Sequence, residues 1–155
     1  MSKVCFCIPA RYNSSRLDKK LLLKFNEETC IAKLVKQVLK SKYANNNIYV
    51  LTDSLLIQEE VSTLGCTAIM TNETYSNGTE RISKNLDLIP DKYEIIVNIQ
   101  ADEPYISPLN IDEAINKHVE HKNTNVFYTT LHEENNSIEY LHSTASLKVV
   151  TDNNN

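Results

Sequence analysis

A loop rich in basic and hydroxyl side chains follows the first apolar run of the sequence. Residues 11–20 carry two arginines and two lysines, with Ser14 and Ser15 between them. Guanidinium groups present planar pairs of donors to phosphate oxygens, and ammonium groups act as point charges. The spacing predicts a polyphosphate site, with a solvated basic loop as the alternative. A Walker phosphate loop is excluded, because the chain has only two glycines and lacks that pattern.

Polar side chains also follow a later apolar run, at residues 95–99. They are Gln100, Asp102 and Glu103, and Pro104 comes next. A carboxylate at the end of a strand is well placed to hold Mg²⁺, which commonly binds through one or two carboxylates together with substrate phosphates. The alternative is structural, because acidic residues before proline also form turns or cap helices. We predict Asp102 as the metal ligand.

A third polar segment, residues 77–81, has the composition of a turn that leads into a helix. It contains Gly78, one of the two glycines, and Thr79 is the expected N-cap. Taken alone, this segment indicates a helix start and no function.

Short apolar runs alternate with amphipathic segments along the whole chain. Strands are expected at residues 3–8, ended by Pro9, and at 48–52, 66–70, 95–99, 126–131 and 146–150. Helices are expected at residues 30–40, 55–64, 81–88 and 111–121. The alternation predicts an α/β fold, a three-layer α/β/α sandwich with a mainly parallel sheet. In such sheets ligands bind beyond the carboxyl ends of the strands, so the loops after residues 8, 52 and 99 should form the site.

Length and composition limit the class of protein. The 155 residues, 41% of them hydrophobic, fit a single domain over residues 1–155. A net charge of -4 argues against a protein that mainly coats nucleic acid. No apolar run approaches the roughly 20 residues that cross a bilayer, and no signal-peptide pattern is present, so we expect a cytoplasmic protein without a membrane partner. We also expect reduced cysteines, with Cys5 and Cys7 pointing the same way from one strand.

Taken in order, the three polar segments resemble the signatures of the 3-deoxy-manno-octulosonate cytidylyltransferase family. Residues 9–17, PARYNSSRL, are similar to its opening PARYxSxRLPGKPL signature, with Lys20 on the family's lysine. Residues 77–81, NGTER, are similar to its SGT[DE]R segment, and residues 97–104, VNIQADEP, to its VNxQGDEP segment. The resemblance spans the chain but only the N-terminal portion of the family's usual length.

The resemblance implies a Rossmann-like fold of the nucleotide-diphospho-sugar transferase type. It also implies that a hydroxyl of an acidic sugar, 3-deoxy-manno-octulosonate, attacks the α-phosphorus of CTP and releases pyrophosphate. The implied catalytic residues are Arg11, Lys20 and Asp102, with Asp102 holding Mg²⁺. The implied nucleotide-binding residues are Pro9, Ala10, Arg11, Ser14, Arg16, Lys20, Asn77, Gly78, Thr79, Arg81 and Gln100. The expected partners are CTP and the sugar, with a homodimer or a second chain completing the site.

The chain departs from the family pattern near each segment. Asp18 and Lys19 stand where the family has Pro-Gly, a pair that presets a turn and tolerates unusual backbone angles. Ala101 replaces a glycine beside the predicted metal ligand, and Asn77 replaces a serine. These changes keep two alternatives open: a truncated nucleotide-binding remnant with weak or no catalysis, and a different sugar nucleotidyltransferase that needs a partner chain.

Overall fold

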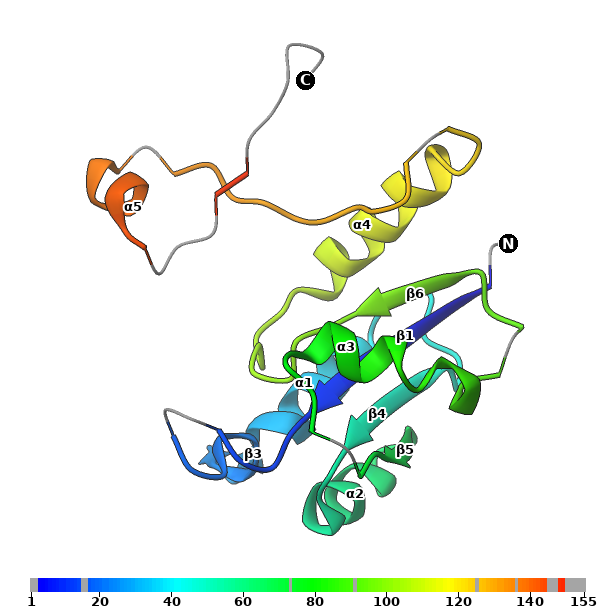
Figure 1. Ribbon diagram of the computed structural model, residues 1–155, viewed down its shortest axis with the longest axis vertical. Helices are drawn as coiled ribbons and strands as arrows, with labels where there is room; N and C mark the ends of the chain where they lie inside the picture. Colours follow the sequence, from blue (N-terminus) through cyan, green and yellow to red (C-terminus); the bar gives the residue numbers. More distant parts are fainter. Residues whose placement is uncertain are drawn as a thin grey trace.

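A four-stranded parallel sheet forms the centre of the computed structural model, which describes residues 3–14, 17–72, 74–90, 92–124, 126–135, 137–144 and 148–149. The strand order is β5-β4-β1-β6 (Figure 1). The strands are β1 (Val4–Ala10), β4 (Ile48–Thr52), β5 (Thr67–Met70) and β6 (Ile95–Asn98). In the register, Phe6 of β1 lies opposite Ile48 of β4 and Val97 of β6, so β1 is an interior strand.

Helices cover both faces of the sheet, which confirms the predicted three-layer α/β/α fold. Side chains of α1 (Cys30–Val38), α2 (Leu55–Ser62) and α4 (Pro108–Glu120) pack into the core on one face, around Phe6 and Ile8. The helix α3 (Gly78–Ser83) and the 3-10 turn η2 (Leu86–Leu88) accompany a smaller core on the other face. Every residue of β1 is buried as a result, which explains its continuous apolar run.

Side-chain caps define where the helices begin. Thr29 accepts a hydrogen bond from the Ala32 amide at the start of α1, and Ser54 does the same for α2. The prediction of Thr79 as a cap is wrong, because the Asn77 side chain accepts from the Glu80 amide at 2.9 Å. The predicted helix at residues 81–88 therefore starts earlier, and it divides into α3 and η2.

The sequence suggested that Pro9 ends the first strand, but the strand continues through Pro9 to Ala10. Pro9 lies within β1, opposite Leu51 of β4. The Phe6 amide donates toward the β4 side, to Asn47, so the nitrogen of Pro9, three residues on, faces the β6 side. The ladder with β6 ends opposite Cys7, and the missing N–H of Pro9 therefore costs no ladder bond.

The predicted strand at residues 126–131 is wrong, since this segment has neither helix nor strand geometry. Among the residues that the structure describes, no strand pairs with this segment, and a strand requires a hydrogen-bonded neighbour. A contact of 2.9 Å between His118 Nδ1 and Thr129 Oγ1 ties the segment to α4. Only Lys148 and Val149 of the strand predicted at residues 146–150 are described, without regular structure; the other residues of this prediction lie outside the described residues.

Smaller elements complete the chain. A 3-10 turn, η1 (Lys20–Leu22), is followed by a short antiparallel hairpin of β2 (Lys24–Phe25) and β3 (Glu28–Thr29). Near the end, α5 (Ile138–His142) buries none of its residues and lies apart from the sheet (Figure 1). Among the described residues, no helix has the length and apolar character that crossing a membrane requires.

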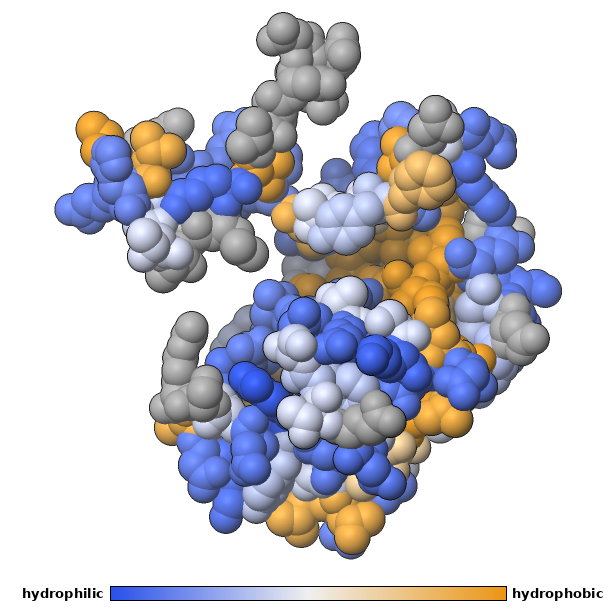
Figure 2. Space-filling view, viewed as in Figure 1, coloured by the Kyte–Doolittle hydropathy of each residue, from blue (hydrophilic) through white to orange (hydrophobic). Residues whose placement is uncertain are grey.

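The outer edge of β6 is open. Within the described part of the chain, β6 pairs with β1 alone. Figure 2 shows an apolar hollow on this side of the molecule, and Leu86, Ile89, Tyr93 and Ile96 line a hollow at the same edge. The Ile96 side chain is 43% exposed although it belongs to a strand. The edge of the sheet at β6 therefore exposes apolar side chains of the kind that are usually buried in a protein interior.

Candidate active site

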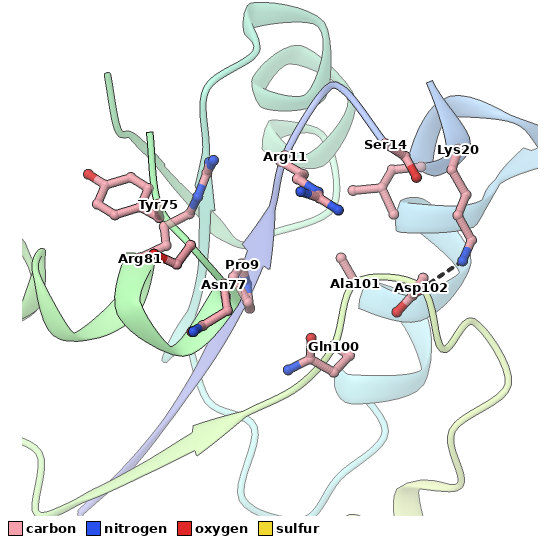
Figure 3. A pocket seen from close by; sticks show the side chains of 13 residues that line it. Pro9, Arg11, Ser14, Lys20, Tyr75, Asn77, Arg81, Gln100, Ala101 and Asp102 are labelled. Atoms are coloured by element: carbon pink, nitrogen blue, oxygen red, sulfur yellow. Dashed lines mark hydrogen bonds and ion pairs between the residues drawn. The ribbon is translucent and has the colours of Figure 1, made fainter. Parts of the chain in front are cut away.

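A cavity of about 300 Å³ lies at the carboxyl ends of β1 and β6, next to the start of α3 (Figure 3). The sequence predicted a site at this end of the sheet, beyond the carboxyl ends of the strands. The lining comes from three separate segments of the chain. It consists of Pro9, Arg11, Ser14, Lys20, Leu21, Tyr75, Ser76, Asn77, Gly78, Arg81, Gln100, Ala101 and Asp102.

Most of the residues predicted to bind nucleotide lie around this one cavity. Ala10 is an exception, being fully buried at the end of β1, and Thr79 lies in α3 outside the lining. Arg16 falls outside the described residues. Tyr75 and Ser76 line the cavity without having been predicted, and their nearness to residues 77–81 was the only signal in the sequence. The binding roles of all these residues stay predictions.

The predicted metal ligand and the predicted phosphate ligand contact one another. Lys20 Nζ donates to Asp102 Oδ2 at 2.8 Å, and the two side chains are 39% and 50% exposed. The hydrogen bond from Lys20 and the positive charges of Lys20 and Arg11 hold the pKa of Asp102 below its ordinary value, although partial burial opposes this. Asp102 therefore presents a carboxylate at neutral pH, between two cationic side chains.

The segment that carries Asp102 is held from both sides. Gln100 Nε2 donates to Asn98 Oδ1 at 3.2 Å, and Asn98 Nδ2 donates to Thr79 Oγ1 at 3.1 Å. On the opposite side, the buried Cys30 thiol of α1 donates weakly to the Ala101 carbonyl at 3.8 Å. Burial raises the pKa of Cys30, so this thiol keeps its proton. Thr79 thus contacts Asn98 without lining the cavity itself.

Gly78 lets the start of α3 approach β1 closely. A Cβ atom at this position would lie 2.6 Å from Cγ and 3.1 Å from Cβ of Pro9. Side chains cannot come so close, so any larger residue would push α3 away from the strand. The glycine is therefore required for close packing of two walls of the cavity, and its backbone lies beside the Gln100 side chain.

Arg81 forms an ion pair with a residue that the sequence prediction missed. Its Nη2 atom donates to Asp53 Oδ2 at 2.8 Å, and its Nη1 atom donates to Thr71 Oγ1 at 3.1 Å. Partial burial would raise the pKa of Asp53, but hydrogen bonds from Arg81 and from the Tyr12 amide outweigh it and lower that pKa. Asp53 is the first residue after β4, in a loop that the sequence did mark as part of the site.

The turn before Lys20 bears out the importance of the Pro-Gly pair that the family pattern has there. Lys19 has φ 51° and ψ 29°, the left-handed region that favours glycine. Its ammonium lies 5.8 Å from the centre of the Tyr12 ring. Lys19 therefore has the left-handed backbone conformation that glycine adopts most easily, although lysine has a Cβ atom.

None of the four cysteines lines this cavity, although Cys30 contacts the Ala101 carbonyl beside it. Cys5 and Cys7 project from the same face of β1 with their sulfurs 4.0 Å apart, as predicted, and all four cysteines are free. Within the part of the chain that the structure describes, no group of three or more His, Cys, Asp or Glu residues could hold a metal ion. A metal at this site would need Asp102 together with oxygens of a bound ligand.

Known proteins share both the sequence and the architecture. A family model described as cytidylyltransferase matches residues 5–155. A 3-deoxy-manno-octulosonate cytidylyltransferase of Francisella tularensis subsp. holarctica is 33% identical over 100% of this chain and 61% of its own length. The same enzyme of Pelodictyon phaeoclathratiforme is 42% identical over 113 residues, which are 73% of this chain and 44% of the relative.

A solved structure agrees with these relatives. It is a CMP:2-keto-3-deoxy-manno-octonic acid synthetase complexed with CTP, with a TM-score of 0.72 and 30% identity, and the match covers 78% of this chain and 49% of that one. This chain spans less than two thirds of the length of each relative. Since the family model matches almost every residue, the chain belongs to the cytidylyltransferase family.

Proposed function

We propose that the chain binds CTP in the cavity and transfers CMP to an acidic sugar, 3-deoxy-manno-octulosonate, with release of pyrophosphate. The observation that carries this proposal is the meeting of Arg11, Lys20, Gln100 and Asp102 around one cavity. The relatives named for this reaction are longer than this chain, which spans 61% of the Francisella protein. Family membership supports the nucleotide, and the choice of sugar comes from the relatives' names.

The cavity offers positive charge where a triphosphate would need it. In the proposed reaction, the oxygen of a sugar hydroxyl bonds to the α-phosphorus while the bond to the bridging oxygen of pyrophosphate breaks. The hydroxyl proton passes to solvent water, and the departing pyrophosphate takes the electron pair of the broken bond, so its negative charge increases. Arg11 and Lys20 would hold the phosphate oxygens and stabilise that charge, and Asn77 and Gln100 would contact the nucleoside. Alignment and charge neutralisation are the main contributions of a protein to phosphoryl transfer.

The donor set fits Mg²⁺. Asp102 supplies one carboxylate, and the phosphates of CTP would supply further oxygens, which is a usual arrangement for this ion. When bound, Mg²⁺ would neutralise phosphate charge. Lys20 donates to Asp102 Oδ2, so an ion held by this carboxylate would compete with the ammonium group for it. Lys20 would then be free to contact the phosphates of the nucleotide.

Pyrophosphate release from CTP, Mg²⁺ and 3-deoxy-manno-octulosonate tests the proposal directly. The Asp102→Asn variant should lower the rate by about a hundredfold, because the carboxylate that holds the ion is lost. It should also abolish the Mg²⁺ dependence of CTP binding. The Glu103→Gln variant is the matched control, because Glu103 is a neighbouring carboxylate outside the cavity lining. Unchanged Mg²⁺ dependence in Asp102→Asn would remove the metal assignment.

A second candidate is nucleotide binding without efficient turnover. It is favoured by the composition of the cavity, whose described lining contains a single carboxylate, already paired with Lys20. In this case CTP raises the melting temperature, and no pyrophosphate is released at high protein concentration with any acidic sugar tested. Release with an acidic sugar other than 3-deoxy-manno-octulosonate would instead indicate a related sugar nucleotidyltransferase.

The proposed function includes a further polypeptide that completes the site, either a second copy of this chain or another chain. The open edge of β6 and the apolar hollow beside it support this part of the proposal. Sedimentation of the purified chain, alone and with CTP and Mg²⁺, distinguishes the two cases. A dimer indicates the second copy, and an active monomer would refute the need for any partner.

A further inference from the structure

We infer that Asp53, which does not line the cavity, is a positioning residue. It holds the loop that follows β1, at residues 11–14, in the position that binds the phosphates of the nucleotide. The inference rests on the proposed function, because it assigns a role in CTP binding. Its basis is a carboxylate that holds two different walls of the site at once. One oxygen contacts the loop after β1, and the other contacts α3.

The first contact extends the pairing of β1 with β4 beyond the ends of the strands. The ladder finishes with Ala10 opposite Thr52. Two residues past Ala10, the Tyr12 amide donates to Asp53 Oδ1 at 2.7 Å. Since Asp53 follows Thr52 directly, this side chain replaces the ladder bond that a longer strand would have made. The backbone beside Arg11 is thereby fixed at the point where it leaves the sheet.

The second contact anchors the carboxylate in the protein. Arg81 donates to Asp53 Oδ2, and its side chain is only 6% exposed, whereas that of Asp53 is 34% exposed. The guanidinium also donates to Thr71 Oγ1 and lies 5.2 Å from the centre of the Tyr75 ring. Both terminal nitrogens of Arg81 thus contact protein acceptors, and a buried guanidinium requires a counter-charge. Arg81 therefore holds Asp53 in place.

The position of the Arg11 side chain at the cavity depends on the contact between Asp53 and the Tyr12 amide. Arg11 shares a peptide bond with Tyr12, and Figure 3 shows its side chain on the side of the cavity where Ser14, Lys20 and Asp102 lie, while Arg81 lies beside Tyr75. A loop that is fixed before the ligand arrives loses less conformational entropy on binding. Loss of the Tyr12 contact should therefore weaken binding of the triphosphate more than binding of the nucleoside monophosphate.

Two matched double variants isolate the Tyr12 contact from the buried charge. Both carry Arg81→Met, which removes the cation that would otherwise be left unpaired. The first adds Asp53→Asn, which keeps an oxygen to accept from the Tyr12 amide, and the second adds Asp53→Leu, which has none. The Leu variant should bind CTP about tenfold more weakly than the Asn variant, the size expected for one hydrogen bond of this kind. The difference for CMP should be smaller, and the Tyr12 amide should exchange hydrogen faster in the Leu variant.

Equal CTP affinities in the two double variants would overturn the inference. If the Leu variant does not fold, Tyr12→Pro removes the same donor in an exposed loop, with Tyr12→Ala as its control, and the same tenfold difference is expected. A parallel loss for CTP and CMP would indicate a merely structural role and overturn the inference as well. If the wild-type chain does not bind CTP, the proposed function itself fails. That failure is visible before any variant is made.

Discussion

At the scale of single residues, Lys19 shows the energetic effect of replacing a glycine in a tight turn. Its left-handed backbone conformation costs about 1–2 kcal/mol for a residue with a Cβ atom. The turn precedes Lys20, whose ammonium reaches Asp102. The strained backbone of Lys19 thus lies directly beside Lys20, on which the proposed chemistry depends.

Lys19→Gly should raise the stability of the chain. Glycine relieves the strain, although the greater freedom of the unfolded chain offsets part of the gain, so we expect a net gain of about 1 kcal/mol. For a chain of this size that corresponds to roughly 2–4 °C in melting temperature. Lys84→Gly is the control, because Lys84 has an ordinary φ of -78°. A decrease in both variants would contradict a strained turn.

Residue types predicted the cavity better than they predicted the contacts inside it. Arg11, Lys20 and Asp102 could be chosen because cations and a carboxylate after strands indicate phosphate and metal chemistry. Asp53 could not be chosen, because its importance comes from a hydrogen bond to a backbone amide 41 positions earlier in the chain. A contact of that kind leaves no periodic pattern in the sequence.

At the scale of elements, the Asp53–Arg81 pair connects the end of β4 with α3. A carboxyl group whose pKa is lowered in the folded state stabilises that state above the pKa of the unfolded chain. This stabilisation is lost as the pH falls through the folded pKa. Because an ordinary aspartate has a pKa of about 3.9, the loss begins at about pH 5, where the unfolded chain starts to bind protons.

The stability of the Asp53→Asn/Arg81→Met double variant should therefore depend less steeply on pH than that of the wild-type chain between about pH 5 and pH 3. Urea unfolding at several pH values measures this difference. Glu28→Gln serves as the comparison, since Glu28 pairs with Lys36 on the surface, and an exposed pair contributes little. If the double variant follows the wild-type profile, Asp53 has no lowered pKa.

The elements that the sequence predicted correctly are those with a partner in the chain. The four strands of the sheet and the four helices that pack on it were recognised from apolar periodicity. Residues 126–131 have the same apolar, β-branched character, but they pair with no strand of the described residues, and Thr129 contacts His118 of α4. Local preference predicted a strand there, and only the tertiary structure shows that the segment pairs with none of the four described strands of the sheet, although the outer edge of β6 is open.

At the scale of the whole molecule, the described sheet has two edge strands, β5 and β6, and the edge at β6 borders an apolar hollow. Leu86, Ile89 and Ile96 line the hollow beside the open edge of β6. Open edges with apolar surroundings favour pairing between chains. The fold class could be predicted from alternating strands and helices, but the open edge could not, because it depends on which strand lacks a neighbour.

Ile96→Lys should reduce self-association of the chain. A charged side chain on β6 opposes pairing of this strand with a strand of another chain and makes the apolar hollow more polar. We expect the affinity of self-association to weaken about tenfold. Light scattering against protein concentration measures the effect. Leu55→Lys is the control, because Leu55 is 66% exposed on α2 and does not line the hollow. An equal effect of both variants would show that charge alone, not the edge, is responsible.

The position of β1 inside the sheet also determines when its thiols become protected during synthesis. Domains fold as units while the chain is made from its N-terminus, yet β1 gains its second neighbour only when β6 has been made. Cys5 and Cys7 pack with Ile82 and Ile89, which lie in the middle of the sequence, after β4 and β5. The strand β1 is thus enclosed on both sides only after β6 has been made. Until then, this adjacent pair of thiols stays accessible to oxidants.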